Sequence, residues 1–555
     1  MLILKENIGA LTDKLYAFKN RCWELNIINT IDIFDSLGSF IKIYVYGSEV
    51  KRILPLKNDF VNEEWISNKT RYFFEGLTKW RINIPLMKKL GTMIYISWKQ
   101  AFYYFLLKIW YYSFFHNTRN LIFLNSIFTD YELIITSKIL IKKLGFLSFN
   151  KKINININDY YLYYLNPNFF ENIKRKKIFI FIGYNLRLES PILNIKLRKK
   201  KLKEGVLFFM IGSIFNDNLG AKNIGLNIKN LINYLYGKIK ITNLIIKNNK
   251  KLNINNNILN SNVFLFGNNI IQRLDNKSIL NIIYKHNNSL NLLYNNLNSI
   301  SNFFFEFCKK NVLYIFEKKN ININLNILYL NLSTILYEEF NLINNINNIE
   351  KITNNDIIYL LGIDDLKLKK SKFSIFQGHH INLEYLNIDL IFPSTTFLER
   401  LSHYLDIEGN FLQTNFVLFP PVFSRNDWSI LNALYIYILN FVNKVFEIKF
   451  YQKITYLVAN RFYFFINNIN KIYFFLKKES MNFYYKKITK SKLYFYNITN
   501  NIIYFIKKIV KIYNNIINNK YYNPYTTNII SQNSEILKKC AIEFNSLIRN
   551  FENIK

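Results

Sequence analysis

The sequence predicts an α/β fold in which βαβ units build parallel sheet, with a small β-rich region at the N-terminus and a helical region at the C-terminus. Two observations support this prediction. Short apolar runs end at glycine or proline and alternate with segments of helical periodicity, as expected of buried parallel strands joined by helices. The length of 555 residues allows at least one large core and two or three lobes.

Near the N-terminus, apolar and polar residues alternate from Ile41 to Val45, and a second apolar pair follows Gly47. This pattern predicts a hairpin with one buried face. Ser97 is expected to cap a helix, because its hydroxyl can accept from a backbone N–H of the first turn. The segment "LIFLN" then reads as a strand, and a helix capped by Asp130 is expected to run to Gly145.

The central block contains the clearest βαβ unit. The apolar run Ile178 to Ile182 predicts a buried strand, and Ser190 with Pro191 predicts the start of a helix. Gly205 ends that helix and releases the strand Val206 to Ile211, so the crossover should be right-handed on a parallel sheet. A third strand is expected at "NVFLFG", which ends at Gly267.

Further strands are predicted at "IIYLLG", "FSIF" and "IDLIF", the last two ended by Gly378 and Pro393. The segment "TTFLERLSHYLDIEGN" can begin a helix at a Thr cap and stop before Gly409. A helix is also expected from Trp428 to about Val442. A C-terminal helix should dock through a stripe at helical spacing, formed by Leu537, Ala541, Phe544 and Ile548.

Composition bounds the function. The formal net charge is +36, which suits a nucleic-acid-binding protein. Lys, Asn, Ile, Phe and Tyr are abundant while Gly and Pro are scarce, so an AT-biased organellar genome, without any nucleic-acid partner, is the favoured explanation of the basicity. The Tyr-, Lys- and Phe-rich segment 451–525 could stack single-stranded nucleic acid, but aromatic residues at helical spacing more often make core or partner contacts.

Cysteine spacing and hydropathy further limit the classes of protein to which the chain can belong. Cys22, Cys308 and Cys540 are too far apart for a CxxC motif, which leaves a local metal or cluster site unsupported. No secretory signal or transit peptide opens the sequence, as expected of a protein made in the organelle where it works. The most apolar windows, near 102–115 and 430–442, are shorter than a spanning helix and predict buried helices.

The stretch from Ile375 to Trp428 contains several short motifs in a fixed order. It resembles the molybdopterin-oxidoreductase-like domain of the large iron-sulfur subunit of respiratory complex I, NADH:ubiquinone oxidoreductase. That family carries "Q-G-H-H", "D-V-I-L-P" followed by "E", "N-T-E-G-R-x-Q" and "P-P-G-x-x-R-x-D-W". The matching residues are Gln377, Gly378, His379, His380, Asp389, Pro393, Glu399, Glu408, Gly409, Gln413, Pro420, Pro421, Arg425, Asp427 and Trp428. Asn410 departs from the family's Arg.

Two other blocks carry the same resemblance. The segment from Gly183 to Lys199 resembles "G-T-N-P-R-x-E-A-P-x-L-N-A-R-I-R-K", with Leu186 in place of the family's Pro. The family's "V-G-A-L-T-x-K-x-Y-A-F" and "N-E-E-W-I-S-D-K-T-R" are matched from Ile8 onward and from Asn62 to Arg71. Resemblance is weak in 281–356 and 451–525.

The resemblance places Glu6 where the family has the last cysteine of an iron-sulfur site. Because a carboxylate cannot replace a soft thiolate, this chain is expected to carry no cofactor. The iron-sulfur clusters and FMN are expected on partner subunits. A separate cysteine-rich iron-sulfur protein, a missing N-terminal half, is therefore expected to bind near the N-terminus of a split subunit.

No catalytic, cofactor-binding or metal-binding residue is expected on this chain. The loop Gly183 to Glu189 lies at a strand's C-terminal end, where related molybdenum enzymes hold their pterin, but no phosphate-binding loop or nearby Cys accompanies it. His379, His380 and His403 could suggest zinc, yet their spacing favours histidines that are hydrogen-bonded within the fold. Trp65 and Arg71 are expected to pack and cap rather than to carry electrons.

Three domains are predicted: a linker over residues 1–80, an α/β body over 81–428 and a helical region over 429–555. The resemblance implies a structural part of the complex I matrix arm, on the matrix side of the mitochondrial inner membrane. Other arm subunits, including the flavoprotein, would be its partners; no nucleic acid is expected, and membrane contact only through the complex. The alternatives are an organelle-encoded RNA-binding or ribosomal protein, and an active molybdenum oxidoreductase.

Overall fold

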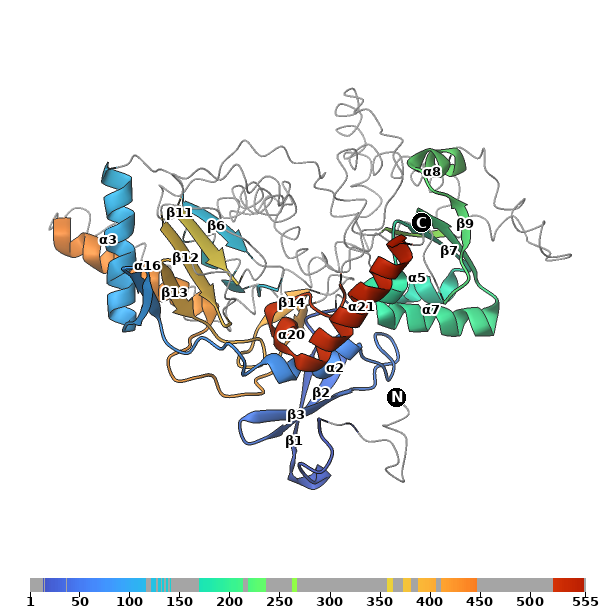
Figure 1. Cartoon of the computed structure of the whole chain (residues 1–555), viewed down its shortest axis with the longest axis horizontal. Helices are drawn as coiled ribbons and strands as arrows, with labels where there is room; N and C mark the ends of the chain where they lie inside the picture. The colour runs from blue at the N-terminus through green and yellow to red at the C-terminus, as the bar shows by residue number, and fades with distance from the viewer. Residues whose placement is uncertain are drawn as a thin grey trace, which may run out of the picture.

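A computed structural model of the chain describes residues 13, 15–35, 37–115, 121–125, 128–130, 132–133, 136–137, 140, 169–212, 218–235, 262–266, 357–362, 373–380, 388–405, 411–446 and 523–553. The described residues form an N-terminal antiparallel sheet, two larger sheets with helices, and a pair of C-terminal helices that lies between the two larger sheets (Figure 1). This confirms the predicted α/β fold with a β-rich N-terminal region.

The N-terminal sheet has the order β1-β2-β3 and is antiparallel throughout. Its strands are β1 (Asn26–Ile31), β2 (Phe40–Tyr46) and β3 (Glu49–Pro55), preceded by the short helix η1 (Cys22–Glu24). Ile41 and Ile43 are fully buried on one face, and Gly47 takes a positive φ of 60° at the turn. The predicted hairpin is therefore confirmed.

The six-stranded sheet has the order β5-β4-β13-β12-β11-β6. Its parallel strands are β6 (Leu121–Asn125), β11 (Ile357–Leu361), β12 (Phe373–Gly378) and β13 (Leu390–Pro393). An antiparallel hairpin, β4 (Leu86–Lys89) and β5 (Thr92–Tyr95), extends one edge. The four parallel strands were predicted, and the hairpin was not.

Two long helices pack against this sheet, α3 (Trp98–Phe115) and α16 (Asp427–Phe446) (Figure 1). Their buried side chains, such as Phe105 and Leu431, share one core with Tyr359 and Phe392 of the sheet. Ser97 precedes α3 as predicted: its hydroxyl accepts from the Gln100 N–H at 3.4 Å, and the Gln100 side chain accepts from the Ser97 N–H at 3.0 Å.

The four-stranded sheet is parallel, with the order β10-β7-β8-β9. Its strands are β7 (Ile178–Ile182), β8 (Leu207–Ile211), β9 (Lys222–Gly225) and β10 (Asn262–Phe266). Its helices are α5 (Phe169–Arg175), α6 (Leu186–Glu189), α7 (Pro191–Glu204) and α8 (Ile228–Leu235). Pro191 opens α7 and Gly205 ends it at φ 65°, so the predicted β7–α7–β8 unit is confirmed.

The loop that follows β3 connects the N-terminal sheet to α7. The Lys196 ammonium donates to the Phe60 carbonyl oxygen, and Lys199 forms an ion pair with Glu63. Lys199 also lies over the Trp65 ring, 5.8 Å from its centroid. The "NEEW" segment is thus docked on a helix of the same chain, and Trp65 packs as the sequence predicts.

The C-terminal helices are α20 (Ile529–Asn533) and α21 (Glu535–Asn553). They contact the short helices α2 (Asn68–Tyr72) and η2 (Phe73–Gly76), and α2 in turn contacts β3 of the N-terminal sheet (Figure 1). Leu537 and Ala541 are buried, as the predicted stripe requires. Ile530 approaches Gly76 so closely that a Cβ there would lie 2.0 Å from the Ile530 carbonyl oxygen.

The helix expected between Thr395 and Gly409 is wrong. Thr396 and Glu399 close a single turn, because the Glu399 N–H donates to the Thr396 carbonyl oxygen and the Glu399 carboxylate accepts from the Thr396 N–H. The chain then enters the short strand β14 (His403–Leu405), which pairs with β15 (Phe411–Gln413). The buried polar contacts of the turn override the local helical pattern.

The remaining sequence predictions concern residues outside the described set or boundaries that no observation tests. Residues 281–356 and 451–522, the end of the helix expected at Gly145, and Glu408 to Asn410 lie outside the described residues. The domain boundaries at residues 80 and 428 stay predictions. Within the described ranges, no helix combines the length and apolar character that crossing a membrane requires.

Candidate functional site

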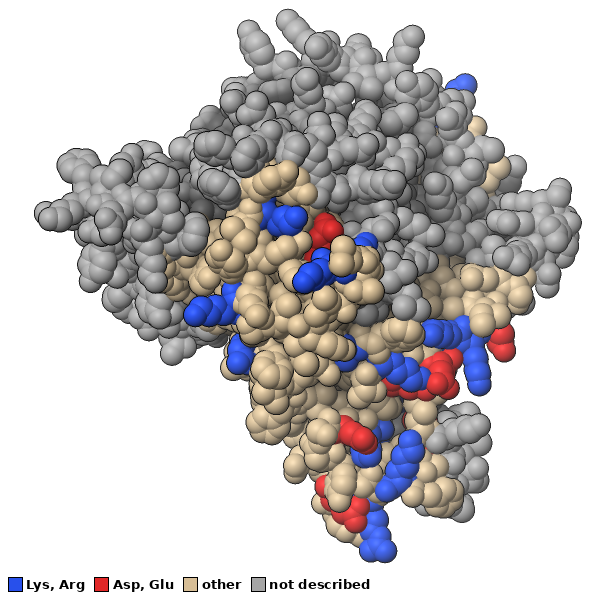
Figure 2. Space-filling view, turned by 60° about the vertical axis from the view of Figure 1, so that its left-hand side comes forward, with Lys and Arg blue, Asp and Glu red and all other residues tan. Residues whose placement is uncertain are grey.

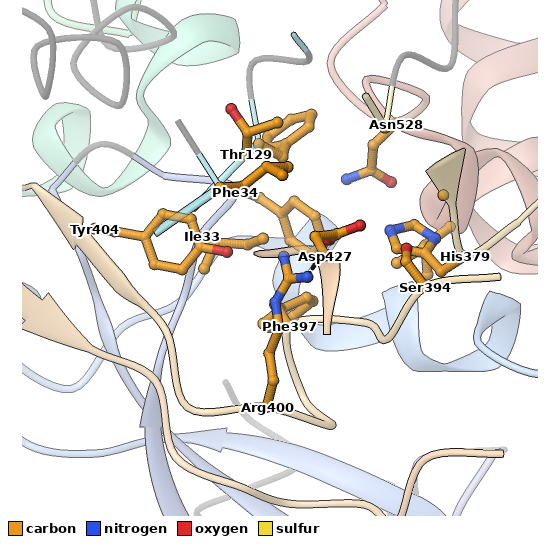
Figure 3. Close-up of a pocket in the computed structure, with 15 residues that line it drawn as sticks. Ile33, Phe34, Thr129, His379, Ser394, Phe397, Arg400, Tyr404, Asp427 and Asn528 are labelled. Atoms are coloured by element: carbon orange, nitrogen blue, oxygen red, sulfur yellow. Dashed lines mark hydrogen bonds and ion pairs between the residues drawn. The ribbon is translucent and has the colours of Figure 1, made fainter. Parts of the chain in front are cut away.

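The candidate site is a buried junction where loops at the C-terminal ends of β12 and β13 meet the N-terminal sheet and α20 (Figure 3). It contains a cavity of about 40 Å³ that is partly open. Residues from every one of these parts line the cavity: Ile33, Phe34, Phe128, Thr129, Leu133, Gly362, Gly378, His379, Ser394, Phe397, Arg400, Tyr404, Asp427, Asn528 and Ile530. The site therefore brings together segments that are far apart in the sequence.

Arg400 is the central cation of the junction. Its guanidinium forms ion pairs with Asp427 and with Asp130, whose Oδ2 lies 3.4 Å from the Arg400 Nε. Burial lowers the pKa of Arg400, but the two carboxylates outweigh burial and hold this pKa well above its usual value. Burial also raises the pKa of Asp130 to about 7, against the pull of Arg400. One arginine thus balances two buried carboxylates.

A hydrogen-bonded series connects this cluster to the sheet. The Gln377 side-chain amide donates to the Asp427 Oδ1 at 2.8 Å and to the Asp427 carbonyl oxygen at 2.9 Å. The Tyr359 hydroxyl donates to the Gln377 Oε1 at 2.8 Å. Gln377 at the end of β12 therefore holds the first residue of α16 in place.

A second ion pair holds the loop after β13. The Arg81 guanidinium donates to the Glu399 carboxylate at 2.5 Å and to the Ser394 carbonyl oxygen at 3.1 Å. Both side chains are less than a tenth exposed. Burial lowers the pKa of Arg81, and Glu399 opposes that shift. The pair joins the segment before β4 to the turn at Thr396.

His379 and His380 contact each other through their Nδ1 atoms, which are 2.6 Å apart. The His380 Nε2 donates to the Leu77 carbonyl oxygen at 2.9 Å. Burial, assisted by the nearby Arg81 cation, lowers the pKa of His380 to about 3, so this ring is neutral near pH 7. Burial lowers the pKa of His379 well below its usual value too.

The third histidine considered for zinc lies apart from this pair. The His403 Nδ1 contacts the Glu132 carboxylate, and the His403 backbone N–H donates to the same carboxylate at 3.3 Å. Across the described residues, no group of three or more His, Cys, Asp or Glu side chains is arranged to hold a metal ion.

Other sequence motifs surround the junction rather than form it. Asp389 accepts from the Ser374 N–H at 2.8 Å, and Arg425 donates to the Val422 carbonyl oxygen at 2.8 Å. Gln413 lies in β15, and Trp428 packs against the core of the six-stranded sheet. Sequence reasoning missed four charged residues that matter here, namely Arg81, Asp130 as an ion-pair partner, Glu132 and Arg400. In the sequence, the one feature that marks these four residues is a charged side chain next to an apolar run.

The loop after β7 was the second candidate crevice. Gly183 has a positive φ of 56°, and its N–H donates to the Ile211 carbonyl oxygen at 2.9 Å. The Tyr184 side chain is 1% exposed and its hydroxyl lies 2.5 Å from the Ser190 Oγ. Tyr184 packs into the core of the four-stranded sheet. Its ring therefore occupies the interior beneath this strand end.

Near the N-terminus, Cys22 is exposed, and its Sγ lies 3.7 Å from an Arg52 guanidinium nitrogen and 3.8 Å from the Tyr16 hydroxyl. Cys540 is the other cysteine in the described ranges and is partly exposed on α21. Cys22 therefore lies near the N-terminus of the chain, and Cys540 lies near its C-terminus.

Two family models match the chain. The model described as molybdopterin oxidoreductase matches residues 81–437. The model described as NADH-ubiquinone oxidoreductase NDSU1/NuoG-like, 4Fe-4S domain, matches residues 25–75.

Similar curated proteins agree with these matches. The NADH-ubiquinone oxidoreductase 75 kDa subunits of Reclinomonas americana and Acanthamoeba castellanii are 29% and 31% identical, and each match spans 77% of this chain. The mitochondrial 78 kDa subunit of Candida albicans is 28% identical over 77% of this chain. The matches cover 59%, 58% and 54% of these three relatives, so the chain spans little more than half of their length.

The expectation that this chain carries no cofactor is wrong. The 4Fe-4S domain match over residues 25–75 points to an iron-sulfur cluster bound on this chain. Such clusters are held by four cysteine thiolates, whereas residues 25–75 contain no cysteine. The matched residues therefore do not supply a ligand set by themselves. The loop at Gly183 does not fit a pterin cofactor either, because Tyr184 fills the interior there and no thiol lies in that loop.

Proposed function

Because this chain belongs to the molybdopterin oxidoreductase family, we propose that it is a structural part of the large iron-sulfur subunit of respiratory complex I, in the matrix arm at the mitochondrial inner membrane. The observation that carries the proposal is similarity over 77% of the chain to 75 and 78 kDa subunits of NADH-ubiquinone oxidoreductase. The α/β body would shape and support the arm, while hydride and electron transfer take place at cofactor sites.

The chemistry of the junction supports a structural role. Arg81, Arg400 and their carboxylate partners are buried and paired with one another, so they fix the positions of loops rather than face a substrate. The cavity of about 40 Å³ is far smaller than the 300 Å³ or more typical of pockets for organic ligands. Breaking one partner of such a buried pair would leave an uncompensated charge, at a cost of roughly 3–5 kcal/mol.

We further propose that a cysteine-rich iron-sulfur protein docks at the N-terminal sheet. The cluster to which the 4Fe-4S match points needs more thiolates than residues 25–75 contain, so a partner would supply them. The other partners would be the remaining subunits of the matrix arm, including the flavoprotein. Chemical cross-linking of the intact complex should connect such a protein to Lys5, Lys14 or Lys19.

The assignment is tested by fractionating solubilised mitochondria on a native gel. The chain is expected to comigrate with NADH dehydrogenase activity and with other matrix-arm subunits. Migration with ribosomes, or binding to RNA that weakens steeply with salt, would favour the RNA-binding alternative instead. Figure 2 shows Lys and Arg dispersed over one face of the described surface with Asp and Glu among them, rather than gathered into a single basic patch.

A further inference from the structure

The cavity at the junction is lined by polar atoms that lack hydrogen-bond partners among the described residues. Ser394 is 1% exposed and its Oγ has no such partner. Asn528 is 3% exposed; its Oδ1 accepts from the Ser531 N–H at 2.6 Å, but its Nδ2 has no partner. A buried polar atom left in this state costs roughly 1–3 kcal/mol, so the unpaired atoms of Ser394 and Asn528 at one cavity need an explanation.

The histidine pair adds a third polar atom with a defined role. The His380 Nε2 must carry a proton, because it bonds to the Leu77 carbonyl oxygen. Since the ring is neutral, its Nδ1 carries no proton and accepts from the His379 Nδ1–H. The His379 ring has then donated its single proton, so its Nε2 is an acceptor. His379 lines the cavity (Figure 3), on the opposite side of Asp427 from Tyr404.

The size and chemistry of the cavity define its ligand. A volume of about 40 Å³ holds about three water molecules, at roughly 10–15 Å³ each, and excludes organic molecules. The lining presents a donor at Asn528, an acceptor at His379 and a hydroxyl at Ser394 that can act either way. Arg400 lies in the same wall and disfavours a bare cation, while Asp427 disfavours an anion. Water donates and accepts, and it is neutral.

We infer that a cluster of about three ordered water molecules fills this cavity and hydrogen-bonds the loops after β12 and β13 to the C-terminal segment at α20. The water cluster completes a relay that runs from the Leu77 carbonyl oxygen through His380 and His379 into the junction. It would join a residue of the N-terminal region to Asn528, which caps α20. This inference concerns the hydration of the fold and does not depend on the proposed role in complex I.

The direction in which Ser394→Ala shifts the midpoint of thermal unfolding tests the inference. If water bonds to the Ser394 hydroxyl, Ser394→Ala breaks a hydrogen bond and lowers the midpoint of thermal unfolding. If the hydroxyl has no ligand, Ser394→Ala removes an unsatisfied group and raises the midpoint. Ser424→Ala is the matched control, because Ser424 is equally buried at 1% exposure and its hydroxyl donates to the Pro421 carbonyl oxygen at 2.8 Å.

The full-length chain, or the complex that contains it, should be used for both variants. Ser394→Ala is expected to lower the midpoint by an amount similar to Ser424→Ala, about 2–4 °C for each kcal/mol in a domain of roughly 150–250 residues. A midpoint at or above that of the wild type would overturn the inference.

A high-resolution structure gives an independent readout that needs no variant. Solvent density is expected within hydrogen-bond distance of the Ser394 Oγ, the Asn528 Nδ2 and the His379 Nε2. A dry cavity, an ion in place of water, or rotation of these side chains onto protein partners would each contradict the inference.

Discussion

At the scale of single residues, the junction depends on ionisable side chains whose neighbours fix their charge states. His380 is held neutral by burial, whereas Asp130 is held partly protonated near pH 7. A change in pH alters the stability of the fold in opposite directions through these two groups. A histidine with a lowered pKa destabilises the fold as pH falls below about 6.5, where the unfolded chain binds the extra proton. An aspartate with a raised pKa destabilises it as pH rises from about 4 towards 7.

The histidine effect can be isolated with His380→Gln, which keeps a side-chain donor for the Leu77 carbonyl oxygen. Wild-type stability should fall as pH drops from about 6.5 towards 3, with His380 contributing a slope of up to about 1.4 kcal/mol per pH unit. The variant should lose that contribution, and the Asp130 effect cancels in the difference. Denaturant unfolding at pH 7, 6, 5 and 4 measures both proteins. A variant with the same pH slope as the wild type would show that His380 does not titrate in this way.

At the scale of elements, most strands could be predicted because each one is a local apolar run ended by Gly or Pro. The run Ile178 to Ile182 coincides with β7, and Gly378 and Pro393 are the last residues of β12 and β13. The helix expected after Thr395 failed because long-range partners decide that segment: Arg81 binds Glu399, and Asp427 binds Arg400. These partners are distant in sequence, so no local pattern could indicate the ion-pair junction.

The contact between η2 and α20 predicts a strict requirement for glycine at residue 76. A Cβ at this position would lie 2.0 Å from the Ile530 carbonyl oxygen, a backbone atom that cannot rotate away. Gly76→Ala should therefore displace α20 and cost about 1–3 kcal/mol, as overpacking does in other cores. Limited proteolysis should cut the C-terminal segment faster in the variant. Lys539→Ala, an exposed change on α21, serves as the control, and equal cleavage of the two variants would argue against this tight contact.

At the scale of the whole molecule, one surface loop is unusually apolar. The segment 416–423 exposes Phe416, Phe419, Val422 and Phe423, by 40%, 82%, 79% and 49%. Exposed apolar patches commonly mark surfaces that contact other molecules or promote aggregation. The isolated chain should therefore self-associate through this loop.

Light scattering of the isolated full-length chain tests this expectation. Phe419→Ser combined with Val422→Ser should lower the scattering and raise the soluble yield, because the Phe419 and Val422 side chains of the wild type expose apolar surface to water. The control is Leu202→Ser, which changes one apolar residue on α7 that is 80% exposed. If the control lowers the scattering as much as the double variant, the loop has no special part in association.

The order of strands in the six-stranded sheet also constrains how the chain folds. β6 pairs with β11 in parallel, so Leu121 lies beside Ile357, and the whole four-stranded parallel sheet lies between these two positions in the sequence. During synthesis, β6 therefore leaves the ribosome long before its partner exists. Pairing between such distant segments requires a large loop to close and is slow, which leaves apolar strands exposed for longer. Chaperone binding to the nascent chain should therefore protect it most between the synthesis of β6 and the synthesis of β11.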